Sequence, residues 1–262
     1  MFEVFFYNKP TIVYTCREGG ELVIEILLKD RTTGKNILWA NAERATEEIF
    51  SDEVYLIEPR WKKLRAQQKQ RTRDRAEIFT PPEVCKIQND LLAAEKKSWT
   101  DYVDEKFLEI TCGEAPYIVS RYNAVTGAPI EIKNRVGLLD RKLIVVSKET
   151  SALNDWINFS LRAVQSVYGY EFQGDNLFLA RKNIFETVKD FFAEKFSSKP
   201  PENFLRSVAE IISWNFWQMD GLTCSPPFTE EANLFGGANC LIKDWRTGKI
   251  FEFRELLKGG RR

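Results

Sequence analysis

From residue 77 to residue 221 the chain alternates between segments typical of helices and short apolar segments typical of strands. Residues 79–96, 151–167 and 176–196 have the apolar spacing of helices, residues 107–113 form a short apolar run, and residues 168–175 are typical of a strand followed by a loop. Alternation of this kind predicts parallel strands that are joined by helical crossovers. We therefore expect an α/β domain over residues 77–262, with helices on both faces of a parallel sheet and a loop or hairpin inserted at about residues 123–147.

The region before this domain has a different pattern of residues. Residues 1–58 are predicted to be β-rich, because the apolar segments 21–30 and 36–42 flank a short polar stretch in which Gly34 indicates a hairpin turn. Residues 59–76 contain no glycine, and proline only at position 59, and are rich in Lys, Arg and Gln. This composition predicts a basic helical connector between the two regions.

Composition excludes several kinds of site. The 262 residues include no histidine, which rules out a histidine-dependent triad, a histidine-ligated metal and an imidazole base. The five cysteines are widely spaced and favour reduced thiols over disulfides or a metal site. We find no apolar run of membrane-spanning length and no secretory signal, so a cytoplasmic protein without a membrane partner is expected.

The connector carries an unusual local charge, although the whole chain balances 38 basic against 38 acidic residues. Between positions 59 and 75 there are eight basic residues and one acid, Asp74. A solvated helix face would explain such a run, and so would an arm that contacts nucleic-acid phosphates. The candidates for backbone contacts, which position a nucleic acid without specifying its sequence, are Arg60, Lys62, Lys63, Arg65, Lys69, Arg71, Arg73 and Arg75.

Ligands of parallel sheets bind beyond the carboxyl ends of the strands. Residues 109–115, 171–175 and 220–221 fall at those ends. A nucleoside cofactor needs a tight turn of small residues, an acid for the ribose hydroxyls and a further acid near the adenine amino group. Gly113, Glu171 and Asp220 provide these in chain order, although each of them also fits an ordinary strand end.

Four segments resemble motifs of the amino-group DNA methyltransferases. Residues 73–90 resemble motif X, residues 107–122 motif I, residues 167–185 motif II and residues 217–222 motif III. The order X, I, II, III is that of the N6-adenine enzymes that serve as modification subunits of restriction systems. The resemblance, which covers about residues 71–228, implies a Rossmann-like sheet that binds S-adenosylmethionine, with double-stranded DNA and a specificity or nuclease subunit as partners.

The resemblance also implies roles for particular residues. Glu171 would hold the ribose, Phe172 would pack on adenine, and Asp220 would meet the adenine edge. Pro116 predicts an extended conformation for Ala115, which stands where the family has a second glycine. The full set of expected cofactor contacts is Phe79, Thr80, Pro81, Glu109, Thr111, Cys112, Gly113, Glu171, Phe172 and Asp220.

A possible catalytic tetrapeptide follows motif III. Ser225, Pro226, Pro227 and Phe228 match the family's motif IV, in which the first residue and the next carbonyl accept hydrogen bonds from the target amino group while the aromatic ring stacks on the flipped base. Only four residues separate Asp220 from the tetrapeptide, where the family has a further strand. A polar Pro-Pro turn is therefore the alternative, which would make the protein a degenerate cofactor- or DNA-binding subunit or an anti-restriction factor. An RNA methyltransferase also stays open, and a nuclease reading is the weakest.

Overall fold

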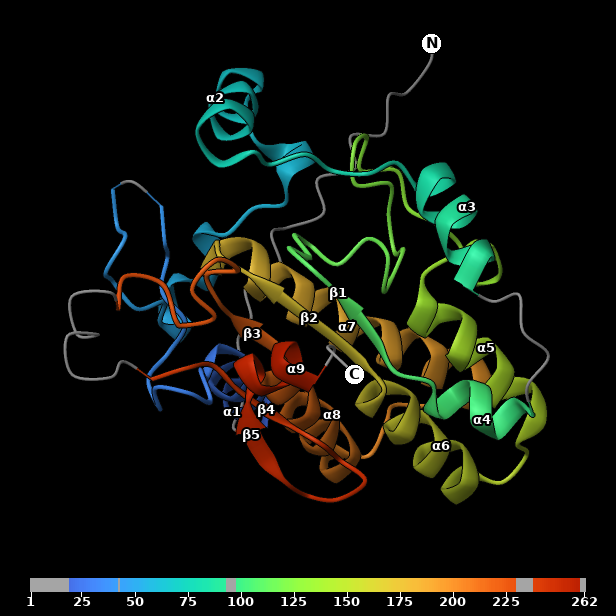
Figure 1. Cartoon of the computed structure of the whole chain (residues 1–262). Helices are drawn as coiled ribbons and strands as arrows, with labels where there is room; N and C mark the ends of the chain where they lie inside the picture. The colour runs from blue at the N-terminus through green and yellow to red at the C-terminus, as the bar shows by residue number, and fades with distance from the viewer. Residues whose placement is uncertain (1–18, 42, 93–97, 230–237, 260–262) are drawn as a thin grey trace, which may run out of the picture.

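The computed structural model describes residues 19–41, 43–92, 98–229 and 238–259 (Figure 1). Its helices are α1 Gly19–Leu28, α2 Arg65–Arg75, α3 Pro82–Leu92, α4 Trp99–Asp104, α5 Leu138–Glu149, α6 Leu153–Gln165, α7 Gly174–Phe196, α8 Glu202–Asn215 and α9 Phe253–Gly259. Its strands are β1 Phe107–Glu109, β2 Val167–Glu171, β3 Phe216–Gln218, β4 Leu241–Lys243 and β5 Ile250–Glu252. Short 3-10 turns span Ser51–Leu56, Arg60–Lys62 and Ile132–Asn134.

A parallel sheet with the order β1-β2-β3 organises the described chain. Phe107 of β1 lies opposite Val167 of β2, and Gly169 of β2 lies opposite Phe216 of β3. Because all three strands run in the same direction, their carboxyl ends meet at one edge of the sheet. The prediction of an α/β domain with a parallel sheet is confirmed.

The two faces of the sheet are covered differently. Val167 and Phe216 pack into a large core with α1 and α5–α8, whereas Tyr168 and Trp217 point to the opposite face and pack into a small core with the β4–β5 hairpin. Figure 1 shows the hairpin and α9 on the near side of the sheet and the long helices behind it. Helices therefore dominate one face, and a hairpin with one short helix covers the other. Leu108 of β1, in register with Tyr168, lies on the hairpin face of the sheet and is 44% exposed.

The N-terminal region differs from the prediction. Residues 21–28 are part of helix α1 and do not form a strand, because Ile24, Leu27 and Leu28 recur at helical spacing and are buried against the main core. Within the described residues 19–58 the only β pairing consists of isolated bridges, such as Lys29 with Asn36. The turn at Gly34 is present, with a φ of +73°. Residues 1–18 of the predicted β-rich region lie outside the described residues.

The connection from β1 to β2 also departs from expectation. No helix follows β1 directly; residues 115–118 form tight turns. The predicted insert begins as a tight turn closed by a bridge between Tyr122 and Pro129, but its second half is helix α5. Leu139, Leu143 and Val146 bury the inner face of α5, so this segment belongs to the core. The crossover is therefore a loop followed by α5 and α6.

The predicted basic connector is helical over α2, which projects from the body of the molecule at the top of Figure 1. None of the residues of α2 is buried. Among the described residues no helix has both the length and the apolar character that crossing a membrane requires. The four cysteines in the described ranges are all free thiols.

Candidate functional site

The turn after β1, residues 109–115, has an unusual backbone. Thr111, Gly113 and Ala115 all have positive φ, at +49°, +55° and +62°. Only glycine adopts this region without cost, so the other two residues store strain. The extended conformation predicted for Ala115 is wrong: its buried N–H donates to the Cys112 carbonyl at 2.7 Å, and this turn outweighs the preference that Pro116 imposes.

Three of the predicted motifs meet at this turn. The Phe79 ring lies against Gly113, where an added Cβ would be 3.6 Å from the ring. The Gly113 N–H donates to the Glu171 carboxylate at 2.9 Å, and the Gln173 N–H donates to the other oxygen of that carboxylate at 2.9 Å. The structure thus brings Phe79, Gly113 and Glu171 together at the carboxyl edge of the sheet.

The same place holds two carboxyl groups that lack basic partners. Burial raises the pKa of Glu171, and burial raises the pKa of Glu109 well above its ordinary value, with the charge of Glu171 adding to the effect. The Glu109 Oε2 atom is buried and has no hydrogen-bond partner in the described part of the chain. Burial likewise raises the pKa of the Cys112 thiol, so this thiol is a packing group and not a nucleophile. The charges of the site are therefore complementary to a positively charged ligand.

Asp220 and Ser225 lie opposite each other in a tight turn that directly follows β3. The Asp220 N–H donates to the Ser225 carbonyl at 2.9 Å, and the Asp220 carboxylate accepts the Leu222 N–H at 2.8 Å. Ser225 is buried, and its hydroxyl lies 2.7 Å from the Thr223 hydroxyl. No strand intervenes between Asp220 and Ser225, so the tetrapeptide does not occupy the position that motif IV has in the family.

Phe228, the last residue of the tetrapeptide, lies near the residues that adjoin the turn after β1. Pro226 and Pro227 are buried, whereas Phe228 is 47% exposed and has a φ of +60°. The rings of Phe172 and Phe228 meet edge to face with centroids 5.6 Å apart. Phe172 immediately follows Glu171, so an aromatic pair adjoins the carboxylate.

Thr80 and Pro81 lie at the start of α3. The Pro81 carbonyl accepts the N–H groups of Val84 and Cys85, which fixes the first turn of the helix. The two residues follow Phe79 directly, but the described contacts tie them to α3 and not to the turn after β1.

Three basic residues of the connector point inward, which the sequence did not reveal. Arg71 forms ion pairs with Glu77 at 2.6 Å and Asp175 at 3.0 Å, and Lys63 reaches Asp175 at 3.2 Å. Arg60 pairs with Glu77 at 3.1 Å. Burial alone would raise the pKa of Asp175, but the charges of Lys63 and Arg71 hold that pKa below its ordinary value.

These ion pairs anchor the connector beside the predicted motifs. Glu77 lies two residues before Phe79, and the Arg60 guanidinium lies 5.5 Å from the centre of the Phe79 ring. The Arg60 N–H also donates to Glu114, next to Gly113, at 2.7 Å. Sequence reasoning missed Asp175 and Glu114 because they are far from the connector along the chain, whereas Glu77 directly follows the connector.

The other basic residues of the connector face solvent. Lys62, Arg65, Lys69 and Arg73 are exposed, and Arg75 is half-buried. The connector is therefore divided into an inner set that is paired with acids and an outer set that is open to water.

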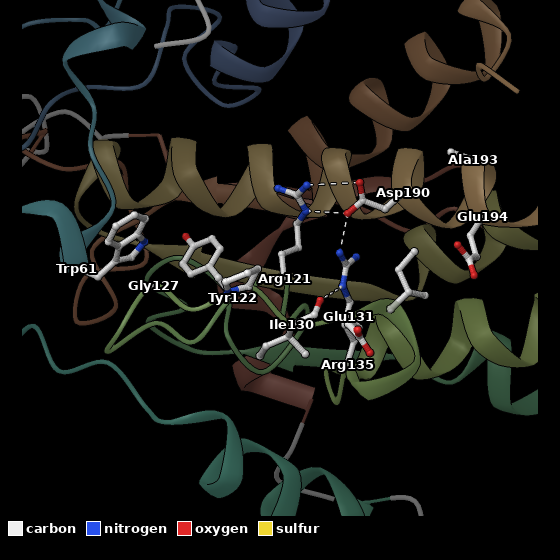
Figure 2. Close-up of a pocket in the computed structure, with 12 residues that line it drawn as sticks. Trp61, Arg121, Tyr122, Gly127, Ile130, Glu131, Arg135, Asp190, Ala193 and Glu194 are labelled. Carbon is white, nitrogen blue, oxygen red and sulfur yellow. Dashed lines mark hydrogen bonds and ion pairs between the residues drawn. The ribbon is translucent and has the colours of Figure 1, made fainter. Parts of the chain in front are cut away.

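A hollow of about 710 Å³ lies on the far side of this region, between the connector, the loop after β1 and α7. Figure 2 shows Trp61 and Tyr122 at one end and Asp190 between Arg121 and Arg135, which it contacts at 3.0 Å and 2.7 Å. Because Glu131 and Glu194 also line it, the hollow has no net positive charge to attract an anion. The Tyr122 hydroxyl, at one end of the hollow, donates a hydrogen bond to Glu114 in the turn after β1.

No family model, no curated protein and no solved structure matches this chain.

Proposed function

We propose that the protein is an S-adenosylmethionine-dependent DNA methyltransferase of the amino-group type, with the N6 atom of adenine as its target. The proposal rests on one observation: the Phe79 ring, the Gly113 amide and the Glu171 carboxylate meet at the carboxyl edge of a parallel sheet. Nucleoside cofactors bind at that edge in open α/β sheets. The segments that meet there are the ones that resemble motifs X, I and II.

The charges of the site support this cofactor. S-adenosylmethionine carries a positive sulfonium and a positive ammonium group, and it supplies the methyl group when it is bound. Glu109 and Glu171 are buried without a basic partner among the described ion pairs, so a positive ligand would favour their ionised forms. Each oxygen of Glu171 accepts one backbone N–H and keeps a further lone pair for a ribose hydroxyl.

The position of Ser225 supports a second candidate function. A catalytic serine of this family must reach the target amino group, yet Ser225 is buried and bonded to Thr223. A cofactor-binding subunit that relies on another protein for methyl transfer would need no such access. Both functions use the same cofactor site, and they differ only in whether the chain alone transfers a methyl group.

Calorimetry with S-adenosylmethionine tests the site. We expect the wild type to bind, and Glu171→Gln to bind at least 10-fold more weakly, because one hydrogen bond to a charged group is worth about 1.5–3 kcal/mol. Glu202→Gln changes an exposed acid at the start of α8 and serves as the matched control. Binding should release protons and strengthen as pH rises through the raised pKa values of Glu109 and Glu171, because the positive ligand favours the ionised carboxylates. A wild type that does not bind would refute the proposal.

A methyl-transfer assay on unmethylated bacterial genomic DNA separates the two candidates. Labelled methyl groups in the DNA would establish the enzyme, and mass spectrometry of the nucleosides would identify the modified base. Cofactor binding without transfer would establish the subunit.

A further inference from the structure

The exposed basic residues of α2 form a single row. Arg65, Lys69 and Arg73 are four positions apart, and this spacing places them on one side of a helix. Successive side chains in the row are separated by about 6 Å along the helix axis, so the row is about 12 Å long. All three residues are exposed. We call them the outer row.

The opposite side of α2 is attached to the body of the protein. Arg71 pairs with the buried carboxylates of Glu77 and Asp175, and Lys63 just before the helix also pairs with Asp175. Breaking such buried pairs is costly, so the helix is fixed in orientation. The outer row is therefore presented outward by a rigid support, at the end of the molecule where the strands have their carboxyl ends (Figure 1).

The outer row is short of acidic partners. A solvated helix face usually pairs each basic residue with an acid three or four positions away. The one acid of α2 is Asp74, which pairs with its neighbour Arg73 at 3.2 Å on the exposed surface. Such an exposed pair is weak and gives way readily to a stronger anion. Arg65 and Lys69 form no ion pair with any described residue.

We propose that the outer row binds phosphates of double-stranded DNA, and that Arg60, Lys63 and Arg71 hold the helix in place without contacting DNA. Guanidinium and ammonium groups form charge-assisted hydrogen bonds with phosphate oxygens, and the release of counterions drives such binding. The inference rests on the proposed function only for the choice of DNA as partner. It assigns six of the eight basic residues of the connector, three to a binding set and three to a positioning set.

The test compares two triple variants with the same change in net charge. The first is Arg65→Gln, Lys69→Gln and Arg73→Gln, and the matched control is Lys199→Gln, Arg206→Gln and Lys249→Gln, three exposed basic residues on other elements that form no ion pair within the described chain. Glutamine is a good helix former and no residue of α2 is buried, so the first variant should fold.

Fluorescence anisotropy with a short labelled duplex, over a series of salt concentrations and without S-adenosylmethionine, gives the result. Three phosphate contacts contribute a slope of about −2.7 to the plot of log K against log salt. We expect the outer-row variant to lose that slope and to bind on the order of 100-fold or more weakly at about 0.1 M salt. The control should keep the wild-type slope.

Several outcomes would overturn the proposal: a wild type that does not bind the duplex, an outer-row variant with the wild-type slope, a control that loses as much slope, or single-stranded RNA that outcompetes duplex DNA. Failure of the proposed function looks different. If the outer row binds DNA but the wild type does not bind S-adenosylmethionine, this inference stands and the methyltransferase reading fails. If the outer-row variant binds S-adenosylmethionine normally but no longer binds DNA, both this inference and the proposed cofactor site stand.

Discussion

Replacing Gly113 by alanine would add one methyl group in the turn where the cofactor is proposed to bind. The added Cβ would lie 3.6 Å and 3.7 Å from two atoms of the Phe79 ring, which is ordinary van der Waals contact. The φ of +55° is a conformation that L-residues rarely adopt. The fold should therefore tolerate the methyl group sterically and lose stability only through backbone strain.

The size of that loss can be calculated. A left-handed conformation costs an L-residue about 1–2 kcal/mol, and the reduced freedom of the unfolded chain returns about 0.4–1 kcal/mol. The net loss is at most about 1.6 kcal/mol, which for a chain of this length lowers Tm by no more than about 6 °C. The methyl group lies between the turn and the Phe79 ring, which is one of the expected cofactor contacts, so the affinity for S-adenosylmethionine should fall far more than the stability.

Thermal denaturation and calorimetry on Gly113→Ala would measure both effects. Gly248→Ala is the matched control, because Gly248 has a φ of +70° with nothing within 4 Å of an added Cβ, and it lies in the β4–β5 turn. Both variants should lose the same small amount of Tm, and only Gly113→Ala should lose cofactor binding. Unchanged affinity in Gly113→Ala would refute the placement of the ligand, and a much larger fall in Tm than in Gly248→Ala would refute the packing argument.

Two further variants test the charges around the turn. Because the pKa of Glu109 is raised in the folded protein, the folded protein holds a proton that the unfolded chain releases. The free energy of unfolding therefore falls as pH rises from about 4.3, the ordinary carboxyl pKa, through the raised value. Urea unfolding of Glu109→Gln at several pH values should show a smaller fall, and an unchanged pH dependence would count against an ionising Glu109. The lowered pKa of Asp175 has the opposite sign, since the stability it confers is present above the ordinary pKa and is lost as pH falls through the lowered value. Asp175→Asn leaves Lys63 and Arg71 short of a counter-charge and should cost about 3 kcal/mol at neutral pH and progressively less in acid; equal stability at neutral pH would contradict the anchoring role.

The long helices were predictable because their apolar residues repeat over enough positions to define a period, whereas the strands were indicated only by short apolar runs. Helix α7 and strand β2 agree with the sequence prediction. Helix α1 was mispredicted because Val23, Ile24 and Ile26 favour a strand by propensity, although Ile24, Leu27 and Leu28 recur at helical spacing; burial of that face in the main core favours the helix. Local preference gives way here to tertiary contacts.

The candidate site was predictable only in part. The segments around Phe79, Gly113 and Glu171 follow a motif order, and the structure places them together. The ion pairs of the connector were not predictable, since Lys63 and Asp175 are 112 positions apart and no local pattern links them. The left-handed Ala115 was not predictable either, because the rule for a residue before proline favours the opposite conformation.

The parallel sheet also has a consequence for how fast the chain folds. Phe107 pairs with Val167, and Gly169 pairs with Phe216, so neither strand contact can form until dozens of intervening residues have been brought into place. Closing such long loops costs conformational entropy before the strand contacts form and offset that cost, so parallel strands pair slowly. We expect the helices that connect the strands along the chain to form first. The register of the three strands, and with it the turn at Gly113, would be fixed late. A newly made chain would therefore spend its longest interval with the helices present and the ligand-binding edge still unformed.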